Sequence, residues 1–454
     1  MILLNKIRKL LKSKFDLINN EKLKKNILNA MPFWAAALIS GGIAVLYAKL
    51  FSLAELGTRV IFAKADWVFF FITPTCFVLS WWIISKYAPF SRGSGIPQVS
   101  AAIELSNPKH YYKINSLVSL RIIFIKIISS LIAVFGGGVI GREGPTIQIS
   151  ASIFKKINDL LPSWYPKISK QNMIVTGAAA GLAAAFNTPL GGIVFAIEEL
   201  TKTHFSFFKS ALLTGVIIAG LTALVFLGPY LYLGYPTLEG ISAFTIVTLI
   251  PLAIVTGFVG SGMGKIIIYI LKKKEKFKKK HQHILYAIIC GLVIASLAVF
   301  IDVRTFGSGK EIMVSTLFTS QKHLEWYIPI LRIIGPVISF TTGVSGGIFA
   351  PALSAGASIG AVFASWFHLS RNETNLVILC GMTGCLTSIT GSPFTSSILI
   401  LEMTNSHNVI FYIMLVALIS NLISKLISKH SFYDQLKSQY INDIHKKQLQ
   451  HIDH

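Results

Sequence analysis

The chain has 454 residues, with 42 Lys and Arg against 19 Asp and Glu, a net charge of +23, 53% hydrophobic residues and only 13% charged residues. A soluble chain has about a quarter of its residues charged, so this composition excludes a soluble multidomain protein and predicts an integral membrane protein. The four cysteines, Cys76, Cys290, Cys380 and Cys385, lie in apolar runs without a C-x-x-C pair, which excludes a disulfide scaffold and predicts buried free thiols.

The first feature in chain order is a basic segment. Residues 1–26 hold eight Lys or Arg against two acids, and we predict a cytoplasmic, basic, amphipathic helix over residues 1–30. The first apolar run begins well after this basic part, so we expect no cleaved secretory signal. Two further basic segments, 272–280 and 425–447, also flank apolar runs. Because Lys-rich flanks stay in the cytoplasm, we expect both termini and the 272–280 loop to be cytoplasmic.

Apolar runs follow along the whole chain, at residues 33–50, 67–85, 117–140, 171–200, 207–233, 245–271, 284–301, 327–366, 375–403 and 409–428. Several exceed the ~20 residues that cross a bilayer, and many contain Gly or Pro, so they predict tilted and broken transmembrane helices. We divide the chain into a first membrane half (31–235), a second membrane half (236–433) and a short cytoplasmic tail (434–454). Nucleic-acid binding would need a folded basic domain, which no segment provides.

An internal repeat relates the two halves. Residues 136–153 align with residues 342–359 at an offset of 206, and Gly-Ser-Gly at 93–95 has a counterpart at 307–309. A further segment aligns at an offset of 204, where Gly177, Leu182, Pro189 and Glu198 match Gly381, Leu386, Pro393 and Glu402. Duplicated halves with interrupted helices predict a transport site between the halves, near the membrane midplane.

Three Gly- and Pro-containing stretches, at 93–97, 141–145 and 346–351, mark the interruptions. A proline at the start of a helix costs nothing, because the first amides have no acceptor within the helix. Those amides and the positive end of the helix dipole attract an anion. The residues that we expect to form these breaks are Gly93, Gly95, Pro97, Gly141, Arg142, Gly144, Pro145, Gly346, Gly347 and Pro351.

Four residues in these stretches are candidate anion-site residues. An ionised Glu143 could occupy the anion's position and leave it when protonated, which predicts a gate; an ion pair with Arg142 is the alternative. Ser94 offers a hydroxyl donor, and Ile348 and Phe349 offer backbone N–H groups. The sequence contains no complete nucleophile, phosphate-loop or metal motif, so we expect no enzyme, no metal and no organic cofactor.

Read together, GSGIP at 93–97, GREGP at 141–145 and GGIFAP at 346–351 resemble the three signature stretches of the CLC chloride channel and transporter family. The similarity extends in the family's order from about residue 93 to residue 433. The resemblance implies an all-α integral membrane protein with two inverted halves. It also implies a homodimer with a separate anion pathway in each subunit.

The resemblance also implies roles for single residues. Glu143 matches the gating glutamate that faces the external side, and Ser94 matches the chloride-selecting serine. Glu199 matches the internal proton-relay glutamate, which exchangers have and channels lack. Tyr433 matches a tyrosine that closes the inner mouth, although the sequence alone equally fits an interfacial aromatic anchor. Lys126 either adds a positive field to the pathway, as the resemblance implies, or snorkels to the membrane surface.

We therefore expect a chloride/proton antiporter in a prokaryotic plasma membrane, with chloride, protons, lipids and a second copy of the chain as partners and no nucleic acid. An uncoupled chloride channel and a secondary carrier for an organic substrate are the alternatives. We interpret Glu198 as an ordinary charge at the cytoplasmic boundary. Two departures from the family pattern stand out. Gln98 replaces a common acidic residue, and residues 391–395 (GSPFT) are more polar than usual, which bears on subunit packing.

Overall fold

The computed structural model describes residues 20–106, 113–201, 209–228, 232–320 and 322–452. Over these ranges the regular structure is helical, apart from two isolated backbone bridges. The helices are α2 (Glu21–Lys64), α3 (Phe69–Tyr87), α4 (Ile96–Glu104), α5 (Ile114–Leu117), α6 (Leu120–Phe135), α7 (Glu143–Asp159), α8 (Lys170–Phe186), α9 (Pro189–Phe195), the π-helical turn η4 (Ala196–Leu200), α10 (Lys209–Leu227), α11 (Ala243–Lys274), α12 (Lys280–Phe300), α13 (Lys310–Phe318), α14 (Tyr327–Thr341), α15 (Phe349–Trp366), α16 (Arg371–Thr390), α17 (Pro393–Thr404), α18 (Ile410–Ile427) and α19 (Phe432–Ile452).

Within the described part of the chain, eight helices are long and apolar enough to cross a membrane. This confirms the predicted all-α, multi-span architecture. Several other helices, such as α4 and α9, are too short to cross a bilayer. The prediction of broken helices is thereby confirmed as well. The four cysteines are free thiols, three of them buried and Cys76 half-buried.

Helices lie at both ends of the described part of the chain. Residues 1–19 of the predicted amino-terminal helix lie outside the described residues, and the rest of that segment belongs to α2, which continues to Lys64. The segment that we assigned as a tail is the helix α19, which packs against α4 and α11. Leu436, Tyr440 and Ile444 are buried and recur every four residues, so one face of α19 belongs to the core.

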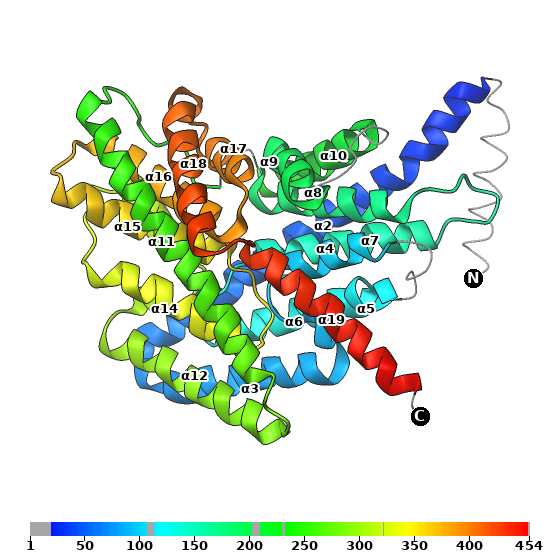
Figure 1. The fold of residues 1–454 in the computed structure, drawn as a ribbon, viewed down its shortest axis with the longest axis horizontal. Coiled ribbons are helices and arrows are strands. Elements are labelled where there is room, and N and C mark those ends of the chain that lie inside the picture. Colours follow the sequence, from blue (N-terminus) through cyan, green and yellow to red (C-terminus); the bar gives the residue numbers. More distant parts are fainter. Residues whose placement is uncertain (1–19, 107–112, 202–208, 229–231, 321, 453–454) are drawn as a thin grey trace.

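In Figure 1, helices α4 to α10 of the first half lie on the right and helices α14 to α18 of the second half lie on the left. Repeat-equivalent pairs pack in the same way, α7 against α8 and α15 against α16. The α15–α16 contact depends on glycine, because a Cβ at Gly356 would overlap the carbonyl group of Gly381. Small residues allow the two helix backbones to approach closely, as is typical of membrane helix interfaces.

Each half contains a fully buried cation that holds the loop before its Gly-Ser-Gly sequence. The Lys126 ammonium of α6 donates to the carbonyl oxygens of Ser91 and Gly93, at 2.9 and 3.0 Å. In α14, 206 residues later (332 − 126), the Arg332 guanidinium donates to the carbonyl oxygens of Thr305 and Gly307, at 3.2 and 3.3 Å. The repeat therefore conserves a structural device as well as a sequence, since both cations satisfy carbonyl groups that no helix can pair.

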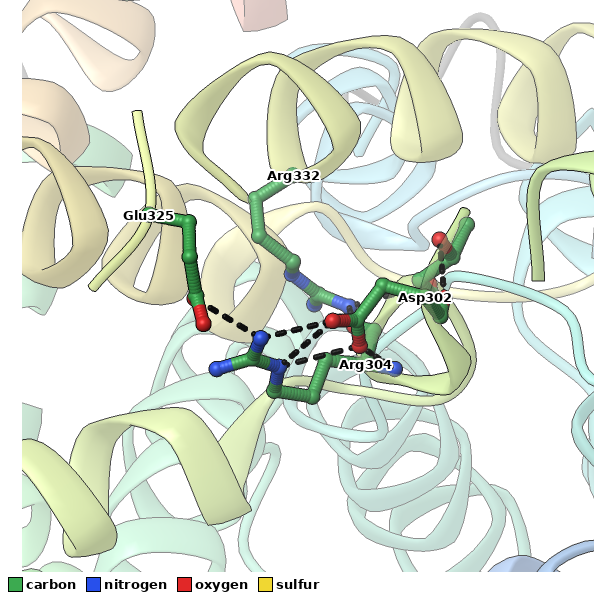
Figure 2. Close-up of polar contacts among 5 residues, drawn as sticks. Asp302, Arg304, Glu325 and Arg332 are labelled. Carbon is green, nitrogen blue, oxygen red and sulfur yellow. Dashed lines mark hydrogen bonds and ion pairs between the residues drawn. The ribbon is translucent and has the colours of Figure 1, made fainter. Parts of the chain in front are cut away.

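Figure 2 shows the surroundings of the second of these cations. Arg304 lies in the loop between α12 and α13 and pairs with Asp302 and Glu325, with shortest distances of 2.6 and 2.8 Å. Partial burial raises the pKa of the Asp302 carboxyl, but the hydrogen bonds and charge of Arg304 outweigh that effect and lower it. The loop is thus held by Arg332 from within and by an ion-pair network from outside.

Candidate functional site

The first and the third of the predicted helix breaks meet in space. The Gly93 amide donates to the Val344 carbonyl at 2.9 Å, and the Gly346 amide donates to the Gly93 carbonyl at 3.1 Å. These bonds join residues about 250 positions apart, from opposite halves of the chain. The non-helical backbone at the break is therefore paired within the protein, as it must be inside a membrane.

The second and third breaks meet through repeat-equivalent residues. The Gly141 amide donates to the Gly347 carbonyl at 2.8 Å, and the Gly347 amide donates to the Gly141 carbonyl at 2.7 Å. The bridge is antiparallel. Because 347 − 141 is the repeat offset of 206, equivalent residues exchange equivalent bonds. Such reciprocal pairing places a local twofold axis between the two glycines, with the two segments running in opposite directions.

Three helices begin at this meeting point: α4 at Ile96, α7 at Glu143 and α15 at Phe349. Gly95 precedes α4 with a φ of 110°, a conformation that favours glycine. The helix starts are close together, since a Cβ at Gly144 would overlap the Ser94 hydroxyl oxygen. The first amides of all three helices, which lack acceptors within their helices, are thus gathered in one small region.

Several buried polar atoms in this region have no hydrogen-bond partner among the described residues, Ser345 Oγ beside the third break among them. Three of these atoms belong to predicted site residues: the Ser94 hydroxyl oxygen, Glu143 Oε2 and the Tyr433 hydroxyl oxygen. Each of the three residues is only 1% exposed. Leaving buried polar groups unpaired is costly, so such groups in a native protein indicate a missing partner. All three residues were predicted from the sequence as site residues, and their open atoms fit an anion with hydroxyl donors and a carboxylate that competes with it.

Aromatic rings line the region from Glu143 to Tyr433. The Phe349 ring stacks on the Tyr433 ring with centroids 6.2 Å apart. The centroid of the Phe186 ring lies 6.3 Å from that of Phe349 and 5.1 Å from that of Tyr232. The predicted site residues Ile348 and Phe349 are each 1% exposed, so their side chains pack into the core while their amides lie at the start of α15.

Glu143 has a contact that the sequence analysis did not find. The Tyr232 hydroxyl donates to Glu143 Oε1 at 3.3 Å. The Lys310 ammonium lies 4.4 Å from the centre of the Tyr232 ring, a cation–π geometry. Tyr232 comes from the connection between α10 and α11, where no motif or periodicity marks it. Its position beside Glu143 depends on packing alone.

The two neighbouring glutamates of η4 bind different parts of α17. The Ser392 hydroxyl donates to Glu199 Oε2 at 2.8 Å, and Glu199 is 8% exposed. Glu198 is not an ordinary boundary charge, which corrects our interpretation. Its carboxylate accepts from the amides of Phe394 and Thr395 at 3.2 and 2.6 Å. It therefore caps the amino terminus of α17, a position that favours negative charge.

The opposite half repeats this cap. Glu402, the equivalent of Glu198, accepts from the amides of Leu190 and Gly191 at 3.0 and 2.6 Å. The two glutamates thus cap each other's helices, α9 and α17, across the interface between the halves. The match between Glu198 and Glu402 was visible in the sequence, but its meaning required the fold.

Comparison with known proteins identifies the family to which a chain with this geometry belongs. A sequence profile described as "Voltage gated chloride channel" matches residues 76–425. The chain belongs to the voltage gated chloride channel (CLC) family. Among its relatives is the H(+)/Cl(-) exchange transporter ClcA of Cronobacter sakazakii, 27% identical over 370 residues, which cover 79% of this chain and 77% of that protein. ClcA of Citrobacter koseri is 27% identical over 417 residues, covering 88% and 85%.

Solved CLC structures share the fold. A slow cyanobacterial Cl⁻/H⁺ antiporter matches with a TM-score of 0.80 and 23% identity, covering 91% of this chain and 98% of that chain. A CLC-type fluoride/proton antiporter matches with a TM-score of 0.75 and 21% identity over the same shares. The fold class predicted from the sequence is therefore confirmed, and the chain is a multi-pass membrane protein.

Two cavities flank the site of this CLC protein. A cavity of about 480 Å³ is lined by residues that include Arg92, Gly93, Lys274 and Tyr440, next to the basic end of α11. A cavity of about 270 Å³ is lined by residues that include Glu55 and the Lys310 that covers Tyr232. The site thus lies between a cavity at the basic loop and a cavity beside the ring that contacts Glu143.

Lys126 is fully buried, and its ammonium donates to the carbonyl oxygens of Ser91 and Gly93, as described above. It therefore lies behind Ser94 and does not reach the membrane surface. Its ammonium is thus held by the backbone that forms the first break, which excludes the snorkelling alternative.

Proposed function

We propose that each subunit is a chloride/proton antiporter, with chloride held between the helix breaks and Glu143 as the gate. The observation that carries the proposal is the convergence of three open polar atoms, on Ser94, Glu143 and Tyr433, at the starts of α4, α7 and α15. The Ser94 and Tyr433 hydroxyls would donate to chloride, together with the amides of Ile348 and Phe349. The H(+)/Cl(-) exchange for which the ClcA relatives are named supports the same function.

Neutral donors suit an ion that must be released as well as bound. Hydroxyl and amide dipoles replace part of the hydration shell without the strong attraction of a fully exposed cation. The buried charge of Lys126 acts one layer behind, through carbonyl groups that it already satisfies. This arrangement supports passage of the anion rather than permanent binding.

Glu143 would couple the two ions because its carboxylate competes with chloride for one position. When ionised, it can accept from the donors that bind the anion. When protonated, it loses that attraction and leaves the position to chloride. Glu199 on η4 would exchange the proton with the other side of the membrane, as the family resemblance implies. One proton carried by Glu143 would then accompany opposite movement of chloride.

The orientation follows from charge. The larger cavity adjoins the Lys-rich segment 272–280, which the positive-inside rule places in the cytoplasm. We therefore infer that this cavity is the inner vestibule, that both termini are cytoplasmic and that Glu143 faces the external side through the smaller cavity. The homodimer and the lipid surroundings are part of the same proposal, and cross-linking in membranes tests the dimer.

Reconstitution into liposomes tests the coupling. An imposed chloride gradient should drive uphill proton movement in the wild-type protein. Glu199→Gln should pass chloride without moving protons, and Glu143→Gln should lose the pH dependence of chloride flux. Chloride flux without proton flux in the wild type would identify an uncoupled channel instead. Flux that depends on an organic solute and ignores chloride would identify a carrier of another class.

A further inference from the structure

The serine before the first residue of α17 does not do what its position would predict. Serine is common at this position because its side chain usually accepts from an amide in the first turn of the helix. Ser392 makes no such side-chain cap bond. Its hydroxyl donates to Glu199 instead, and the two side chains belong to residues that are 2% and 8% exposed. The hydroxyl is therefore committed to a buried carboxylate.

The cap that Ser392 omits comes from Glu198. In addition to two amides, the Glu198 carboxylate accepts from the Thr395 hydroxyl at 2.7 Å. Neighbouring carboxylates of η4 thus contact the same turn of α17, Glu198 through the backbone and Glu199 through Ser392. Because the Glu198 bonds fix this turn relative to η4, the Ser392 hydroxyl is held within hydrogen-bonding distance of Glu199.

The repeat contains a natural counterpart without the carboxylate. Thr188 is the equivalent of Ser392 (392 − 188 = 204) and precedes α9 with φ and ψ of −128° and 82°, against −120° and 80° for Ser392. Its buried hydroxyl has no hydrogen-bond partner among the described residues. The equivalent of Glu199 is Met403 (199 + 204), which offers no carboxylate. The hydroxyl–carboxylate pair therefore occurs only on the side of the proton relay.

We propose that Ser392 is a positioning residue of the proton relay, which holds the Glu199 carboxylate in one orientation and stabilises its ionised form. The proposal rests on the proposed function of Glu199. A hydroxyl donor favours the charged form of a carboxylate, so Glu199 should release its proton at a lower pH than it would beside an alanine. Ser392 belongs to residues 391–395, which differ from the usual family pattern, so this departure would act on proton transfer.

Three further ionisable residues lie on η4, α17 and α19, among the elements around Glu199. Glu198, on the same element, is bound to the first turn of α17. Glu402, at the other end of α17, is bound to α9. Tyr433 on α19 is within electrostatic reach of Glu199, and its hydroxyl lies near that of Ser94. Among the described contacts, Ser392 donates a hydrogen bond to Glu199.

The test measures chloride-driven proton flux in liposomes as a function of pH, with Ser392→Ala as the main variant. Loss of one donor to a charged carboxylate should raise the pH of half-maximal proton flux by about one unit, a tenfold change in proton affinity. Ser392→Thr keeps the hydroxyl and should restore the wild-type profile, and Ser392→Cys, a weaker donor, should fall between. Thr188→Ala is the matched control and should leave the profile unchanged.

Several outcomes would overturn the proposal. The Ser392→Ala profile could coincide with that of the wild type, or Thr188→Ala could shift the profile as much. In the Glu199→Gln background, Ser392→Ala should leave the pH dependence of chloride flux unchanged, and a shift there would show that the serine acts on another group. Proton flux that survives Glu199→Gln would instead refute the proposed relay itself, so the two failures are distinguishable. Ser392→Thr and Ser392→Cys keep the test decisive if the alanine variant does not fold.

Discussion

Tyr232→Phe removes one hydrogen-bond donor from the carboxylate that we propose as the gate, and leaves the ring in place. The Tyr232 hydroxyl contacts Glu143 Oε1 at 3.3 Å, longer than the usual 2.5–3.0 Å for this kind of bond. Hydrogen bonds to charged groups contribute ~1.5–3 kcal/mol, and the long distance favours the lower end. About 1.4 kcal/mol corresponds to a factor of ten in a protonation equilibrium.

The expected result is a shift of the gate toward the protonated, open form. A carboxylate that has lost a donor holds its proton more readily, so the pH at which chloride flux falls to half should rise by roughly one unit. Chloride efflux from liposomes, measured with an electrode across the pH range, gives this midpoint. Tyr286→Phe is the control, because it removes a tyrosine hydroxyl that contacts Thr341 at 2.8 Å, away from the gate. An unchanged midpoint, or a shift to lower pH, would refute the reasoning.

Three further predictions follow from the structure. Gly144→Ala should reduce chloride affinity at least about tenfold in calorimetry, because its Cβ would overlap the Ser94 hydroxyl. Gly42→Ala is the control and should bind chloride normally, since no atom lies within 4 Å of its Cβ. Arg332→Met should lower the free energy of unfolding in detergent by about 3 kcal/mol, since the loop carbonyls lose their donor; an unchanged value would exclude that role. Because the pKa of Asp302 is lowered, its ionised carboxylate contributes to stability above about pH 4, and this contribution is lost as the pH falls through the lowered pKa. The temperature of thermal unfolding should therefore depend less on pH in the acid range for Asp302→Asn than for the wild type.

The sequence was most informative where local backbone physics determines the structure. Gly and Pro at the starts of α4, α7 and α15 act on the residues next to them, so the three breaks and their amides could be predicted without a fold. The same holds for Ser94 and Glu143, which lie within those breaks. Their convergence was predictable because the repeat placed two of the three stretches at equivalent positions in the two halves.

The parts that the sequence analysis missed are contacts between distant segments. Ser392 and Glu199 are 193 residues apart, and Tyr232 and Glu143 are 89 apart, so no spacing rule joins them. Their pairing depends on how α17 packs against η4 and on the path of the α10–α11 connection. The helix α19 is different. Its apolar residues Leu436, Tyr440 and Ile444 recur every four positions and are buried, so their pattern could have been recognised in a segment that its polar composition led us to assign as a tail.

The paired amides of Gly141 and Gly347 have a consequence for biosynthesis. A ribosome that has just finished Gly141 must add another 206 residues (347 − 141) before the bonding partner exists. At roughly 5–20 residues per second this takes about 10 to 40 seconds. During that interval the nascent first half carries exposed peptide groups that lipid cannot solvate. The insertion machinery has to shelter them, and a chain truncated before residue 342 should be degraded rather than accumulate in the membrane.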